Sequence, residues 1–201
     1  MHAGQGQFTN YFLDTYVAHK ISELTKCTAP ECINDEKWLN SFILNSVFRT
    51  QIPTKPKAYI FNFLRRVEGA FKAYQDALAA INEYLSTPSH IISPYFQALN
   101  QLEICISQSY QAYELLTSAT TEKLFTTGEK SIEEKLYTLY IDSKHMDRMI
   151  YGDQIPKETT SGIWITNNGM ASNRSNLTFI ELFEILQDLR KIAKKLASLG
   201  S

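Results

Sequence analysis

The sequence predicts an all-α protein: a single helical bundle of about six helices around a long antiparallel helical hairpin, with a short irregular or hairpin segment near 162–170. Three observations support this prediction. Apolar residues recur at steps of three and four along most of the chain, which is the period of one face of a helix. Two Ser/Thr-x-x-Glu sequences mark helix starts, and only one short run has strand-like composition. The chain has 201 residues, so we expect residues 1–201 to form one domain.

The N-terminal part predicts two helices separated by a break. The first helix is expected within residues 8–24, and the stretch around Pro30 interrupts it. Asn34 or Asp35 can cap the second helix, which ends before Pro53. The apolar faces of the two helices carry Phe12, Leu13, Tyr16, Val17, Ile21 and Leu24, and then Trp38, Leu39, Phe42, Ile43 and Val47.

The clearest helical pattern covers residues 57–85, where apolar residues follow a heptad spacing. Such a stripe is typical of a helix that packs along its length against a partner helix. A second long helix is expected over 93–117, with Pro94 in its first turn. We expect the two to form an antiparallel hairpin. The stripe of the first consists of Ile60, Leu64, Val67, Phe71, Tyr74, Leu78, Ile81 and Leu85.

Two capping boxes place the remaining helices. Ser131, followed by Glu134, begins a fifth helix that is expected to continue to Tyr151. A box at Thr178 begins the last helix, which runs towards Gly200.

The segment between these helices has a different composition. The run Ile163–Thr166 is β-like, and Asn168-Gly169 is a strong signal for a hairpin turn. We expect an ordered loop or a small hairpin with Trp164 tucked beneath it, because a large apolar side chain gains free energy when it leaves water.

Composition excludes several classes of function. The 20 basic and 21 acidic residues leave a net charge of -1, which argues against a protein that covers nucleic acid with positive charge, so no DNA partner is expected. No apolar run reaches membrane-spanning length and no secretory signal is visible, so we expect a cytoplasmic protein without a membrane partner. Three cysteines and four scattered histidines offer no ligand spacing, and we expect neither a metal nor a cofactor.

The fifth helix carries the clearest chemical pattern. Asp142 precedes His145 by three residues, so the two side chains share a helix face, and the carboxylate could orient the imidazole for acid/base work. Asp142, His145 and the nearby Tyr140 are the catalytic candidates, although a structural histidine is an alternative. The candidate phosphate-binding residues are basic side chains of this helix and of the last one: Lys144, Arg148, Arg190 and Lys194. For the last helix, the alternative is that its basic residues are solvated and favour the negative end of the helix dipole.

Five segments within residues 57–199 form a set: Tyr95-Phe96-Gln97-Ala98, Ser109–Tyr113, Leu139–His145, Trp164–Gly169 and the helix start at Leu177–Leu182. Together they resemble the HEPN-like helical domains of bacteria. The resemblance implies a compact bundle that dimerises, often in defence or toxin and antitoxin systems. It also implies a metal-independent ribonuclease with an Arg-x(4 to 6)-His motif completed by the second subunit.

One part of that motif is missing here. The histidine matches His145, but the positions open to the arginine hold Thr138, Leu139 and Tyr140. A guanidinium can clamp a phosphate with two donors, and a tyrosine cannot replace its charge. We therefore expect a catalytically degenerate HEPN-like bundle that forms a homodimer and binds a protein or RNA partner in a defence or stress system. The alternatives are a metal-independent ribonuclease with His145 as general acid/base, and a regulatory bundle that binds a small molecule.

Overall fold

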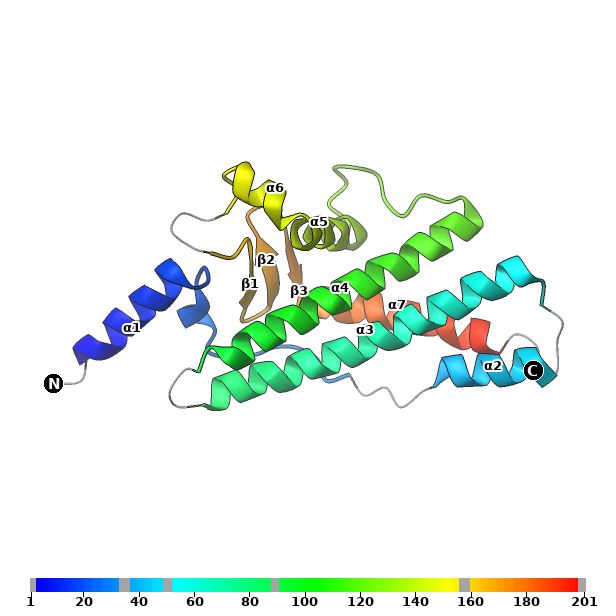
Figure 1. Cartoon of the computed structure of the whole chain (residues 1–201), viewed down its shortest axis with the longest axis horizontal. Coiled ribbons are helices and arrows are strands. Elements are labelled where there is room, and N and C mark those ends of the chain that lie inside the picture. Colours follow the sequence, from blue (N-terminus) through cyan, green and yellow to red (C-terminus); the bar gives the residue numbers. More distant parts are fainter. Residues whose placement is uncertain (1–2, 33–36, 49–51, 88–90, 156–159, 199–201) are drawn as a thin grey trace.

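The computed structural model describes residues 3–32, 37–48, 52–87, 91–155 and 160–198. These residues form a mainly helical protein with one small sheet (Figure 1). The elements in chain order are α1 (Ala3–Tyr16), the 3₁₀ turn η1 (Ile21–Glu23), α2 (Trp38–Phe48), α3 (Thr54–Ser86), α4 (Ser93–Thr120), α5 (Ile132–Lys144), α6 (Met146–Tyr151), β1 (Ile163–Thr166), β2 (Gly169–Ser172), β3 (Asn176–Thr178) and α7 (Phe179–Ala197). No helix in the described part of the chain combines the length and the apolar character that a bilayer crossing requires.

The long hairpin of α3 and α4 lies at the centre of the molecule, as the spacing predicts (Figure 1). Most of the heptad stripe of α3 is buried, and Leu78 and Leu85 are half-buried against the same core. This stripe packs against α4 and α7 of the same chain. The predicted packing surface of α3 is therefore filled within one subunit.

Two further helices pack onto α3. The rings of Trp38 in α2 and Phe71 in α3 lie 5.6 Å apart between centroids. The start of α7 has the predicted capping box, in which Thr178 Oγ1 accepts from the backbone N–H of Glu181 while the Glu181 carboxylate accepts from that of Thr178. These bonds satisfy N–H groups that the first turn of a helix leaves without partners.

The first helix is shorter than the periodicity predicts. It ends at Tyr16, and Lys20 adopts a left-handed conformation with φ 57° before η1. The carboxylate of Asp14 accepts bonds from the backbone N–H and the hydroxyl of Ser22, which fixes this corner. Figure 1 shows α1 extending away from the rest of the molecule, and its main contacts are with η1. The predicted caps Asn34 and Asp35 lie outside the described residues.

The predicted fifth helix is divided into two. Its N-cap is confirmed, since Ser131 Oγ accepts from the backbone N–H of Glu134 at 3.2 Å. The helix then breaks at His145, whose backbone has φ -120° and ψ 48°. His145 is the C-cap of α5 and the N-cap of α6, so the two helices are separate elements.

The all-α prediction is corrected by a three-stranded antiparallel sheet in the order β1-β2-β3. Thr166 pairs with Gly169, so the hairpin connection consists of Asn167 and Asn168 rather than the predicted Asn168-Gly169. A Cβ at Gly169 would lie 2.1 Å from the carbonyl oxygen of Leu177, so the close approach of β3 requires glycine. This segment forms a hairpin, as predicted, and Trp164 is buried, with its ring 4.7 Å from that of His19.

The hairpin connection also ties the N-terminal segment to the sheet. The side-chain oxygen of Asn167 accepts from the backbone N–H groups of Thr25 and Lys26 at 2.9 and 3.1 Å. The backbone carbonyl of Asn167 accepts from Thr28 N–H at 3.1 Å. On the other side, Ile165 N–H donates to the phenol oxygen of Tyr95 in α4 at 3.0 Å. The sheet is thereby fixed to α4 and to residues 25–28.

The burial of Phe71 gives a test of the central packing. Phe71→Ala removes a ring that is 1% exposed, so we expect the free energy of unfolding to fall by about 3–5 kcal/mol through lost transfer energy and a residual cavity. Phe61→Ala on the same helix is the matched control, because Phe61 is 37% exposed and should cost less than about 1 kcal/mol. Urea denaturation measures both, and equal losses would contradict this account of the core.

Candidate functional site

Asp142 lies in the interior between α5 and the sheet. Its side chain is wholly buried, and its Oδ1 pairs with the guanidinium of Arg174. Arg174 lies in the turn between β2 and β3, where Ser172 Oγ accepts from the backbone N–H groups of Arg174 and Ser175. The turn therefore holds the guanidinium of Arg174 directly against the buried carboxylate of Asp142. A buried charge without such a partner would be strongly unfavourable.

The expected contact of Asp142 with His145 is not made. The Oδ1 atom bonds Arg174, and Oδ2 has no hydrogen-bond partner in the described structure. His145 is half-buried at the break between the two helices, where its backbone N–H donates to Ile141 and its carbonyl accepts from Arg148. Because the helix ends at Lys144, the shared face on which the pairing depends is lost at His145.

Tyr140 belongs to a group of stacked tyrosines on α4 and α5. Its ring stacks on that of Tyr110 at 4.7 Å between centroids, and Tyr137 lies 5.3 Å from Tyr110. The ammonium of Lys144 lies 5.4 Å from the centre of the Tyr140 ring and donates to its phenol oxygen at 3.3 Å. Burial, with a further effect of Glu114, raises the pKa of Tyr110 to about 12, so this phenol stays protonated at neutral pH. The group is suited to packing and cation binding.

The four basic candidates do not gather in one place. Lys144 is on α5, and Arg148 is exposed on α6. Arg190 on α7 lies near the thiol of Cys32: burial raises the pKa of this thiol, and the charge of Arg190 partly opposes that rise. Lys194 follows one turn later, near the end of α7 that meets α2 through Asn45 and Ala197. The structure therefore divides these candidates between two regions.

Within the described residues, no group of three or more His, Cys, Asp or Glu side chains is arranged to hold a metal ion. The three cysteines are free thiols, and Cys105 is deeply buried, which raises its pKa to about 12. A thiol with a raised pKa is a weak nucleophile at neutral pH.

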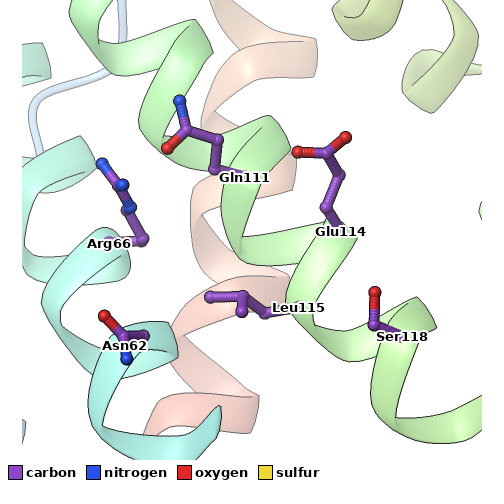
Figure 2. Close-up of a pocket in the computed structure, with 6 residues that line it drawn as sticks. All are labelled: Asn62, Arg66, Gln111, Glu114, Leu115 and Ser118. Carbon is purple, nitrogen blue, oxygen red and sulfur yellow. The ribbon is translucent and has the colours of Figure 1, made fainter. Parts of the chain in front are cut away.

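The sequence did not reveal a groove between α3 and α4 (Figure 2). It has a volume of about 360 Å³, within the usual range of sites for small ligands. Its lining combines Asn62 and Arg66 of α3 with Gln111, Glu114, Leu115 and Ser118 of α4. A second hollow of about 220 Å³ shares Asn62 and Leu115 with it and continues towards Lys55.

The sequence also did not reveal the exposed face of α1. Tyr11, Phe12 and Tyr16 are 60%, 49% and 56% exposed. The Phe12 and Tyr16 rings lie 5.4 Å apart, so they form one continuous aromatic surface. A stripe spacing cannot distinguish a helix that covers a core from one that projects. Of the predicted stripe, Phe12 and Tyr16 are exposed, whereas Leu13, Val17, Ile21 and Leu24 pack inward.

Comparisons with known proteins identify no relative of this chain. The chain matches no protein-family model, no curated protein and no solved structure. Any functional conclusion therefore depends on the chain's own geometry.

Proposed function

We propose that this chain is a helical interaction module that acts as a homodimer, in the manner of a catalytically degenerate HEPN-like bundle. The homodimer would bind a protein or RNA partner on a surface formed by both copies of the chain, in a defence or stress system. The observation that supports dimerisation is the aromatic surface of α1, which extends away from the core with three large side chains about half exposed.

An exposed aromatic cluster of this kind is costly in water. Burial stabilises by about 25 cal/mol for each Å² of apolar surface removed from solvent, and contiguous apolar surface on a projecting element is typical of an interaction site. The helix carries one charged residue, Asp14, and its carboxylate is already bonded to Ser22. Two copies of this face can therefore pair about a twofold axis without bringing like charges together, which favours a second copy of the chain as the partner of α1.

The interior of the candidate site supports a role without catalysis. Asp142 is engaged by Arg174 through Oδ1, and neither of its carboxylate oxygens bonds His145. The helix also lacks an arginine at the spacing that the resemblance requires. The proposal therefore treats Asp142 and Arg174 as a structural pair that locks the sheet to α5.

One observation favours a second candidate, a metal-independent ribonuclease. Arg174 brings a permanent positive charge to α5 from a distant part of the sequence, and its side chain is 42% exposed. With His145 as general acid/base, this guanidinium would take the place of the missing arginine of the motif. It ranks second because the arginine is already neutralised by Asp142.

The oligomeric state tests the aromatic surface. We expect light scattering after size-exclusion chromatography to give twice the chain mass of 23.0 kDa for the wild type. The double variant Phe12→Ser/Tyr16→Ser should elute as a monomer, because it removes two of the three exposed aromatic rings of α1, the two that lie in contact. Tyr151→Ser is the matched control, since Tyr151 is 90% exposed on α6, and it should remain dimeric. A wild type that remains a monomer at a loading concentration on the order of 100 µM would overturn the proposal.

The buried ion pair gives a stability test. Arg174→Met should lower the free energy of unfolding by about 2 kcal/mol, less than the loss for a fully buried pair because Arg174 is partly solvated. Adding Asp142→Asn should restore much of this loss, since the neutral amide needs no counter-charge. Lys191→Met removes an exposed pair with Asp188 and should cost under about 1 kcal/mol. Urea denaturation of the four proteins measures these differences, and no recovery in the double variant would argue against the structural role.

The two candidate functions differ in their ribonuclease activity. We expect purified wild type and His145→Ala to leave a mixed RNA substrate in EDTA equally intact, because the acid/base group lacks an available arginine. Robust cleavage by the wild type that is lost in His145→Ala would replace the interaction module with the enzyme. An Arg174→Lys variant would then show whether this cation belongs to the site.

A further inference from the structure

The groove between α3 and α4 contains an arginine held in place by a neutral partner. The guanidinium of Arg66 donates to the side-chain oxygen of Gln108 at 3.1 Å. Gln108 lies against Gly69, where a Cβ would lie 3.4 Å from its amide carbon and oxygen. Gln108 thus packs directly against α3 at Gly69 while its side-chain oxygen holds Arg66.

The charge of Arg66 is not neutralised within the described residues, in which no carboxylate lies at ion-pair distance from it. Its neighbour Arg65 adds a second positive charge. Partial burial, and then Arg65, lower the pKa of Arg66, so the cation is in an unfavourable position on its own. A half-buried guanidinium with one of its five donors used has capacity for an oxyanion.

The surrounding side chains leave room and polar groups for such a ligand. Figure 2 shows Arg66, Asn62 and Gln111 around the gap between the helices, with Leu115 projecting into it. The amide nitrogens of Asn62 and Gln111 donate to Ala58 and Ser107, which fixes both side chains and leaves their oxygens free to accept.

One acidic residue, Glu114, also lines the groove. In Figure 2 its carboxylate points to the side of α4 away from Arg66. Its charge is therefore directed away from the position that an anion beside Arg66 would take.

We propose that this groove binds a small organic anion, with Arg66 holding its carboxylate or phosphate group and Asn62 and Gln111 accepting from hydroxyl or amino groups on the same molecule. Leu115 provides the apolar contact. The inference does not depend on dimerisation, because the groove lies on α3 and α4 and the aromatic surface lies on α1.

Titration with three probes tests the site: inorganic phosphate, glycerol 3-phosphate and glutamate. Binding is followed through the NMR signals of the side-chain amides of Asn62 and Gln111. We expect saturable shifts for at least one organic probe in the wild type. Arg66→Gln should weaken its binding by roughly tenfold or more, the usual effect of losing a charge-assisted hydrogen bond. This variant keeps a neutral bond to Gln108, so the fold should persist.

Arg65→Gln is the matched control, since it removes the same charge one residue away from an exposed position. Binding that survives Arg65→Gln and is lost in Arg66→Gln supports the groove, and the preferred probe identifies phosphate or carboxylate as the ligand group. Equal weakening in both variants would mean diffuse attraction and would overturn the proposal, as would the absence of saturable shifts in the wild type. Light scattering on the same samples reports dimerisation separately.

Discussion

The long antiparallel contact between α3 and α4 is the constraint on which the other elements depend. Once these helices are paired, polar groups on their surfaces fix the irregular parts of the chain. Tyr74 donates to the carbonyl of Pro30 at 3.0 Å, and Gln75 donates to that of Cys32 at 2.8 Å. Tyr95 provides the corresponding anchor for β1, and burial raises the pKa values of Tyr74 and Tyr95, so both phenols stay neutral.

The helical part of this fold is largely determined by local pattern. The heptad spacing of α3 and the Thr178 box of α7 depend on neighbours within one or two turns, and both predictions are confirmed. The sheet depends on contacts that local pattern does not contain. Its third strand has only three residues, Asn176–Thr178, and leads directly into the cap of α7. The break at His145 was missed for a related reason, because neither glycine nor proline occurs there.

The candidate site shows the same division between local and distant information. A spacing of three residues suggested a pair between Asp142 and His145, but the carboxylate is bonded instead by Arg174, 32 residues away. Arg66 and Gln108 are separated by 42 residues and meet only after the hairpin forms. A sequence pattern can identify residues able to do chemistry, while their partners are decided by tertiary contacts.

The attachment of residues 25–28 to Asn167 has a consequence for the order in which the chain assembles. These bonds join positions 142, 141 and 139 residues apart, so their closure carries a large entropic cost compared with the pairing of adjacent helices. They lie at the exposed turn between β1 and β2, and solvent-exposed bonds of this kind open more readily than those of the core. We therefore expect residues 25–28 to attach to the hairpin turn late in folding and to detach from it before α3 and α4 separate. Amide exchange at Thr25 and Lys26 would follow this detachment while the amides of α3 remain protected.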